Sequence, residues 1–145
     1  MKFVRGNIWD DPAPNLVITV NCVGVMGKGI ALEAKRRWPK LYHDYRKVCF
    51  DELEIFDPCD LRFMGRYGNS PNLYLAATKG HWKYPSKLEW IESCLNWTGH
   101  NFYGEEEAIA IPALGCGNGG FEWSLVKVLC EFHLQGTNAR VYEPE

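Results

Sequence analysis

The chain has 145 residues, of which 46% are hydrophobic and 23% are charged, and this composition excludes a disordered chain. Its length suits one domain with its own hydrophobic core, which we expect to span residues 1–145. The formal net charge of −2 gives no general basic character, so charge alone does not indicate nucleic-acid binding.

Membrane and metal sites are not indicated by the sequence. No apolar run is long enough to cross a bilayer, and the first residues lead into polar sequence without forming a signal peptide. We therefore expect a cytoplasmic protein without membrane contact. The cysteines have no C-x-x-C spacing and no metal-ligand pattern with the histidines, so we expect free thiols and no metal. They are Cys22, Cys49, Cys59, Cys94, Cys116 and Cys130.

The apolar pattern predicts strands that alternate with helices. In chain order, the predicted elements are strands at 3–4 and 16–20, helices at 29–38 and 39–48, strands at 61–64 and 73–76, a helix begun by residues 86–89, a strand at 108–111, a helix at 123–134 and a strand at 139–142. Ser86 and Glu89 have capping-box spacing at the start of the third helix. This alternation predicts an α/β sandwich around a mixed, largely parallel sheet.

A glycine-rich segment, the first glycine loop (residues 21–28), lies between the second predicted strand and the first helix. Glycines let backbone N–H groups turn toward a ligand, and the helix N-terminus adds positive potential, so the pattern favours a phosphate or pyrophosphate. The loop lacks the G-K-[ST] ending of a Walker loop, which disfavours nucleoside-triphosphate chemistry.

A second glycine loop (residues 112–120) lies between the strand at 108–111 and the helix at 123–134. Gly115, Gly117 and Gly120 satisfy G-x-G-x-x-G, but no acidic residue stands about twenty positions on, as a Rossmann fingerprint requires. In α/β sheets, ligands lie beyond the carboxyl ends of the strands, where both loops fall. Two such loops favour a nucleotide diphosphate held from both sides.

Lys79 follows the strand predicted at 73–76 and precedes a glycine. A lysine at a strand end can be a nucleophile when burial or neighbouring cations lower its pKa, and it can equally be a phosphate contact. The next residues, His81, Trp82 and Lys83, either form an ordinary loop or a basic, aromatic rim. Such a rim suits a nucleic-acid strand, because lysines contact phosphates and rings stack on bases.

Together these residues resemble the macrodomain family, whose members bind ADP-ribose, over nearly the whole chain. Three segments carry the resemblance: residues 21–31, residues 78–85 and residues 115–120. They are most similar to a group of antitoxin macrodomains that remove ADP-ribose from thymidine bases in DNA. The resemblance implies a three-layer α/β/α sandwich. The antitoxins also have a C-terminal domain, so we expect residues 1–145 to be either an excised macrodomain or a free-standing enzyme.

The resemblance also implies site roles. Lys79 is the catalytic lysine, assisted by Asn21 at the distal ribose. Asn7 and Ile8 line the adenine pocket, and Tyr142 stacks on the adenine. Gly119 stands where a related vertebrate glycohydrolase has an aspartate, a departure shared with the DNA-directed group. The other implied ligand-binding residues are Gly27, Lys28, Gly29, Ile30, Thr78, Ala113, Gly115, Cys116, Gly117, Asn118 and Gly119.

The resulting hypothesis is a glycohydrolase, without metal or cofactor, that removes ADP-ribose from DNA bases, thymidine first among them. Its expected partners are ADP-ribose and ADP-ribosylated DNA, single-stranded rather than duplex; the sequence does not say whether it has a protein partner. Two alternatives stay open. One is a reader that binds ADP-ribose without turnover, and the other is a hydrolase of ADP-ribosylated protein or of ADP-ribose 1″-phosphate.

Overall fold

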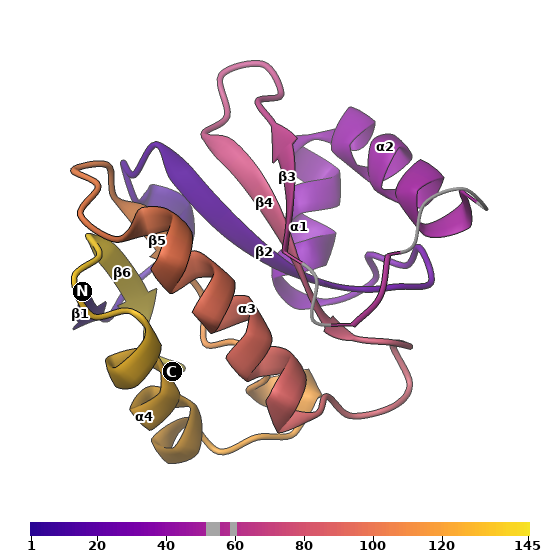
Figure 1. Cartoon of the computed structure of the whole chain (residues 1–145). Helices are drawn as coiled ribbons and strands as arrows, with labels where there is room; N and C mark the ends of the chain where they lie inside the picture. The colour runs from indigo at the N-terminus through magenta and orange to yellow at the C-terminus, as the bar shows by residue number, and fades with distance from the viewer. Residues whose placement is uncertain (52–55, 59–60) are drawn as a thin grey trace.

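The computed structural model describes residues 1–51, 56–58 and 61–145, and within them six strands form one sheet (Figure 1). Their order across the sheet is β1-β6-β5-β2-β4-β3. Every neighbouring pair is parallel except β3 and β4, which are antiparallel. The strands are β1 (Lys2–Val4), β2 (Asn15–Asn21), β3 (Leu61–Gly65), β4 (Asn72–Lys79), β5 (Ile109–Ile111) and β6 (Ala139–Tyr142).

Helices cover both faces of this sheet. Two of them pack into one hydrophobic core with one face, and two pack into a second core with the other face (Figure 1). The first pair is α1 (Gly29–Arg37) and α2 (Pro39–Phe50), and the second is α3 (Leu88–Phe102) and α4 (Trp123–His133). The predicted three-layer α/β/α sandwich with a mixed, largely parallel sheet is therefore confirmed.

Alternation along β2 explains how one strand serves two cores. Leu16, Ile18 and Val20 pack into the core under α1 and α2, whereas Val17 packs into the core under α3 and α4. Successive side chains of a strand point to opposite faces, so a continuous apolar run is what a strand covered on both sides requires. The central strands thereby anchor the loops that leave their carboxyl ends.

Strand β4 is longer than the sequence predicts. The prediction ended it at Ala76, but the strand continues to Lys79 because it pairs with the end of β2. Lys79 stands opposite Asn21, and the register shifts between Val20 and Asn21. Such irregularities re-aim side chains at strand ends. The two residues assigned to catalysis thus lie on neighbouring strands.

The predicted capping box at Ser86 is wrong. Helix α3 begins at Leu88 with Lys87 as its N-cap residue, and no side chain in the described part of the chain caps it. The Ser86 hydroxyl instead donates to the backbone carbonyl of Thr78 in β4. A serine hydroxyl forms one donated bond, and here a buried carbonyl of the neighbouring strand competes successfully for it.

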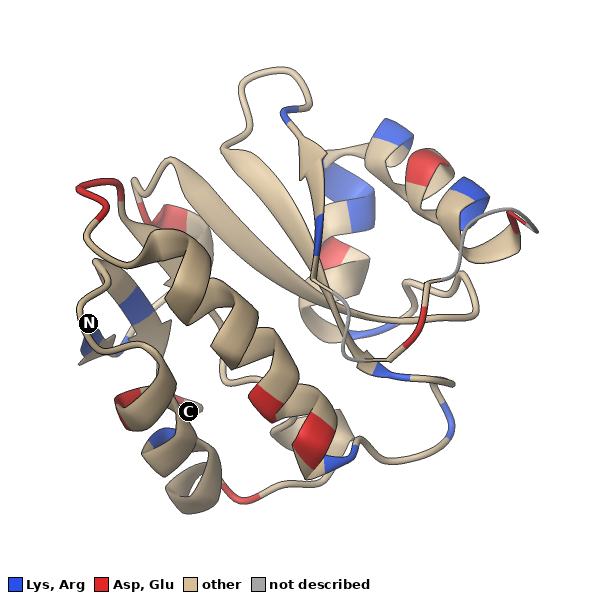
Figure 2. Ribbon diagram, viewed as in Figure 1, with Lys and Arg blue, Asp and Glu red and all other residues tan. Residues whose placement is uncertain are grey.

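Charged residues are distributed unevenly (Figure 2). Lys and Arg gather on α1 and α2, while three consecutive glutamates, residues 105–107, precede β5. Among the described cysteines, Cys49, Cys116 and Cys130 are free thiols; Cys59 lies outside the described residues. No described helix has the length and apolarity to cross a membrane, and no group of three potential metal ligands occurs within the described ranges.

Candidate functional site

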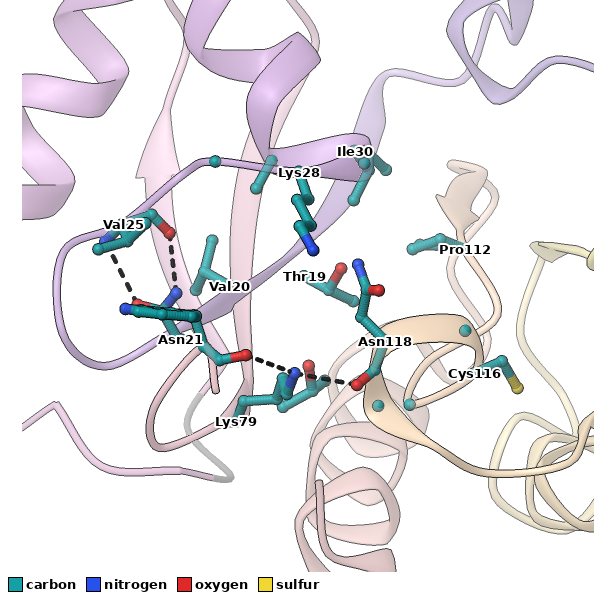
Figure 3. Close-up of a pocket in the computed structure, with 18 of the residues that line it drawn as sticks. Thr19, Val20, Asn21, Val25, Lys28, Ile30, Lys79, Pro112, Cys116 and Asn118 are labelled. Carbon is teal, nitrogen blue, oxygen red and sulfur yellow. Dashed lines mark hydrogen bonds between the residues drawn. The ribbon is translucent and has the colours of Figure 1, made fainter. Parts of the chain in front are cut away.

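A cavity of about 840 Å³ opens where the two glycine loops meet the end of β4 (Figure 3). This volume lies within the range of small-molecule sites in proteins. Predicted residues that line it are Asn21, Gly27, Lys28, Gly29, Ile30, Thr78, Lys79, Trp82, Lys83, Ala113, Gly115, Cys116, Gly117, Asn118 and Gly119. Segments distant in sequence therefore converge at the carboxyl edge of the sheet, as expected for an α/β fold.

The side chain of Asn21 organises the first glycine loop. Its amide oxygen accepts the backbone N–H of Val23 at 3.0 Å and the hydroxyl of Tyr45 at 2.7 Å, and its amide nitrogen donates to the carbonyl of Val25 at 2.8 Å (Figure 3). The Tyr45 hydroxyl also lies 2.8 Å from the Asn21 carbonyl. These bonds use one of the two amide hydrogens of Asn21, so one hydrogen remains for a ligand.

The first glycine loop leads directly into α1. The helix begins at Gly29, where φ is +56°, and Lys28 precedes it with extended backbone. Among the described residues no side chain caps this helix end. Backbone N–H groups of the first turn have no partner within a helix, so they are available to an anion at this position.

The second glycine loop has its own steric requirement. Gly115 adopts a φ of +75°, and a Cβ there would lie 2.7 Å from Cδ1 of Ile91 in α3. The loop closes on itself, since the N–H of Phe121 donates to the carbonyl of Gly115 at 3.0 Å. A 3-10 turn, η2 (Gly117–Gly119), then lines the cavity. Glycine is thus required at position 115 by both backbone and packing.

The ammonium group of Lys79 bridges two backbone segments. It donates to the carbonyls of Trp82 at 3.0 Å and of Asn118 at 2.9 Å (Figure 3). Partial burial, and then the ammonium of Lys28, lower the pKa of Lys79 below its usual value. A lowered pKa raises the fraction of neutral amine at a given pH, which is the form that can act as a nucleophile.

Three aromatic rings, one half-buried and two exposed, cluster in the segment that follows β4, which we call the aromatic rim (residues 81–84). The ring centroid of His81 lies 5.1 Å from that of Trp82 and 5.5 Å from that of Tyr84. Trp82 is 55% exposed and Tyr84 is 61% exposed. The N–H of Lys83 donates to Nδ1 of His81 at 3.0 Å. Trp82 and Lys83 line the cavity, whereas His81 does not.

Three residues assigned to the adenine do not line the cavity. Asn7 is exposed and accepts the N–H of Trp9 at 3.0 Å, while Ile8 lines a separate cavity of about 330 Å³. The hydroxyl of Tyr142 donates to Asp11 at 2.6 Å. Tyr142 nevertheless ends β6, the parallel neighbour of β5, so it lies at the same edge of the sheet as the second glycine loop.

Asp11 was not identified from the sequence. Its side chain is only 2% exposed and forms an ion pair with Arg140, in addition to the bond from Tyr142. It also accepts the N–H of Ala13 at 2.7 Å. The hydrogen bond from Arg140 is the main cause that lowers the pKa of Asp11 to about 2. The residue therefore holds Tyr142 through a buried carboxylate.

Sequence reasoning also missed five apolar or strand residues that line the cavity: Thr19, Val20, Val25, Ala31 and Pro112. One available signal was Thr19, the single residue of β2 that is not buried in an otherwise buried strand. A polar side chain just before the strand's end marks an open position, but it lies outside the glycine-rich motifs. The remaining four look like ordinary core or loop residues in the sequence.

The arrangement can bind an anion and expose a carbon atom to an amine. Backbone N–H groups of two glycine loops and the N-terminus of α1 border the cavity, and Lys28 and Lys79 point into it (Figure 3). Oriented backbone amides and a helix N-terminus bind phosphate groups. An amine at the same site can support covalent or electrostatic catalysis.

Comparisons with known proteins point in the same direction. No family model matches the chain. A DNA ADP-ribosyl glycohydrolase of Thermus aquaticus is 36% identical over 154 residues, an alignment that covers 99% of this chain and 41% of that relative. This chain thus spans about two fifths of the length of the curated relatives it matches.

The chain is also similar to solved structures of DarG and DarTG proteins. The macrodomain of Thermus aquaticus DarG matches with a TM-score of 0.85 and 38% identity, and the match covers 99% of this chain and 97% of that one. Thermosipho africanus DarTG in complex with ADP-ribose matches with a TM-score of 0.84 and 32% identity, covering 98% of this chain and 41% of that one.

Proposed function

The chain belongs to the macrodomain family, in the group of the DarG macrodomains, and we propose that it removes ADP-ribose from ADP-ribosylated DNA bases. The observation that carries this proposal is the position of Lys79. Its ammonium lies in a cavity between two glycine loops, 2.9 Å from the carbonyl of Asn118. A protein that only bound ADP-ribose would need the loops but not a lysine of lowered pKa at this point.

In the proposed complex, the pyrophosphate lies between the two glycine loops, where backbone N–H groups and Lys28 neutralise its charge. The distal ribose then faces Lys79 and the remaining amide hydrogen of Asn21. We assign the adenine to the edge of the sheet near Tyr142. Asn7 and Ile8, which follow the end of β1 in the sequence, are assigned to the same adenine site. The buried ion pair of Asp11 supports this assignment, since it fixes the orientation of Tyr142.

The proposed chemistry breaks the bond between C1″ of the distal ribose and the base nitrogen. The bonding electron pair leaves with the base, and positive charge develops on the sugar. Neutral Lys79 can attack C1″ as this bond breaks, and the leaving base takes up the proton that the new C–N bond releases. Water then hydrolyses the lysine adduct through its ring-opened imine form, which frees ADP-ribose and restores the amine. The protonated form can instead stabilise the departing base electrostatically, while water adds to C1″. Both routes require the amine of Lys79 beside C1″.

The DNA strand is assigned to the aromatic rim. Trp82 and Tyr84 are exposed rings, and Trp82 lines the cavity together with Lys83, which adds a cation. Bases stack on such rings only when they are free of a duplex, so we infer single-stranded substrate. Thymidine is the proposed modified base. A DNA substrate and bacterial relatives favour the cytoplasm as the place of action.

The direct test uses a single-stranded oligonucleotide that carries ADP-ribose on one thymidine. Wild-type protein should release ADP-ribose, and Lys79→Ala should lower the release rate about 100-fold or more, as loss of one catalytic group does in other enzymes. ADP-ribose affinity, measured by calorimetry, should change by only a few fold. Lys40→Ala, which removes an exposed lysine of α2, is the matched control and should behave as wild type.

Other outcomes would redirect the assignment. Binding of ADP-ribose without release from DNA, modified protein or ADP-ribose 1″-phosphate would identify a reader. Activity only on modified protein, or only on ADP-ribose 1″-phosphate, would show that this compound is the substrate in place of modified DNA. Full activity of Lys79→Ala would remove the catalytic role of this lysine. Trp82→Ala should weaken binding of single strands more than Phe132→Ala, which removes a 70% exposed ring of α4.

A further inference from the structure

Ser86 connects the two backbone segments that hold the catalytic lysine. The residue is only 7% exposed. Its hydroxyl donates to the carbonyl of Thr78 at the end of β4, and its backbone N–H donates to the carbonyl of Gly119 in the second glycine loop at 3.1 Å. One serine therefore joins a strand end to a loop that enters from the other side of the cavity.

The contacts of Lys79 lie directly beside those of Ser86. Lys79 follows Thr78, and its ammonium donates to the carbonyl of Asn118, which precedes Gly119. The second acceptor of the ammonium, the carbonyl of Trp82, belongs to the segment that ends at Ser86. A change in the position of Ser86 would thus shift both acceptors relative to the lysine.

We propose that Ser86 is a positioning residue for Lys79. By tying β4 to the second glycine loop, it holds the carbonyls of Trp82 and Asn118 at the separation that the ammonium spans. The part of this inference that concerns catalysis rests on the proposed glycohydrolase function. The part that concerns the position of the ammonium does not.

The Ser86 hydroxyl matters because it donates a hydrogen bond to a buried carbonyl, that of Thr78. Thr78 is buried, with 4% of its surface exposed, so removing the hydroxyl takes a hydrogen-bond donor away from a buried carbonyl. A buried carbonyl that loses a donor favours a shift of the strand end toward water or another donor. The flexible four-carbon stem of a lysine then no longer has a fixed pair of acceptors.

The kinetic test compares Ser86→Ala with wild type on the modified oligonucleotide. The kcat should fall about 10- to 100-fold, because small displacements of a catalytic group have effects of this size. The KM and the Kd of ADP-ribose should stay within about twofold, since the glycine loops remain. Ser70→Ala is the matched control: its buried hydroxyl donates to the carbonyl of Pro71 at 2.7 Å, in the turn between β3 and β4.

A second measurement needs no substrate. Nitrogen-15 relaxation of lysine ammonium groups in the resting protein reports how far each group is ordered. The Lys79 ammonium should be more ordered than that of exposed Lys40 in wild type and in Ser70→Ala. In Ser86→Ala it should approach the value of Lys40.

The two measurements separate the possible failures. If wild type releases no ADP-ribose, the proposed function fails, and the relaxation experiment still decides whether Ser86 positions Lys79. If wild type is active, the inference is overturned by an unchanged kcat in Ser86→Ala, by unchanged order of the Lys79 ammonium, or by equal losses in Ser70→Ala. A parallel loss of ADP-ribose affinity would also overturn it, because the role would then be that of the whole loop.

Discussion

Replacing Asp11 by asparagine tests how the buried ion pair supports the sheet edge that carries Tyr142. The carboxylate accepts hydrogen bonds from Arg140, from the hydroxyl of Tyr142 and from the N–H of Ala13. With only 2% of its side chain exposed, it is poorly screened by solvent. An asparagine has nearly the same shape but no charge, and it provides one acceptor oxygen instead of two.

The magnitude follows from the pKa of Asp11. It falls from 3.8 to about 2, chiefly through the hydrogen bond from Arg140. Since a tenfold change in proton affinity corresponds to about 1.4 kcal/mol, the ionised carboxylate contributes about 2 kcal/mol to the free energy of unfolding at neutral pH. The pKa is lowered in the folded state, so this contribution is complete above about pH 4 and is lost as the pH falls toward 2.

Urea unfolding of wild type, Asp11→Asn and the control Asp10→Asn measures this contribution. At pH 7, Asp11→Asn should lower the free energy of unfolding by about 2 kcal/mol, and the difference from wild type should shrink as the pH falls below 4. Asp10 is exposed, so Asp10→Asn should have the same free energy of unfolding as wild type. A loss at pH 7 that persists undiminished near pH 2, or no loss at pH 7, would refute the electrostatic reasoning.

Three further predictions concern the loops and the rim. Gly115→Ala should lower the free energy of unfolding by about 2 kcal/mol or more, because its Cβ would lie 2.7 Å from Ile91. Gly117→Ala, whose Cβ would meet no atom within 4 Å, should lower it by about 1 kcal/mol. Equal losses of the two variants in thermal unfolding would contradict this. Tyr45→Phe removes the hydroxyl that lies within hydrogen-bond distance of both the carbonyl and the amide oxygen of Asn21, and it should lower the free energy of unfolding in urea by about 1–3 kcal/mol. ADP-ribose binding, measured by calorimetry, should weaken as well, and unchanged values would show that the hydroxyl does not support the loop. Lys83→Ala should reduce the salt dependence of single-strand binding, measured by anisotropy, by about 0.7 in the slope of log K against log salt, and an unchanged slope would exclude a phosphate contact.

Much of the fold could be predicted from the sequence. The apolar runs of the central strands and the stripes of the helices predict the described strands and α-helices, because burial on two faces leaves few polar positions in β2 and β4. The two 3-10 turns, at Ile8–Asp10 and Gly117–Gly119, were not predicted. The end of β4 could not be predicted, since residues 77–79 extend the strand only by pairing with β2. The family assignment made from the motifs is confirmed by the DarG macrodomains.

The site was predictable to the extent that it is made of loops. Glycine-rich segments after strands are visible in a sequence, and both do line the cavity. Partners across the fold are not visible. The pattern Ser86 to Glu89 has capping-box spacing, yet the hydroxyl bonds to Thr78, which lies eight positions away and on another element. Asp11 likewise meets Arg140 and Tyr142 only after the ends of the chain come together.

Some polar groups around the cavity already form hydrogen bonds within the protein, and others are available to a ligand. This difference indicates which groups recognise the ligand. The Asn21 oxygen accepts the Tyr45 hydroxyl and loop N–H groups, and the Lys79 ammonium is held by two carbonyls. The groups left for an anion are chiefly backbone N–H groups of the loops and of the first turn of α1. Affinity for ADP-ribose should therefore depend on backbone conformation, and so on the glycines, whereas turnover should depend on one side chain, Lys79, and on the residues that hold it.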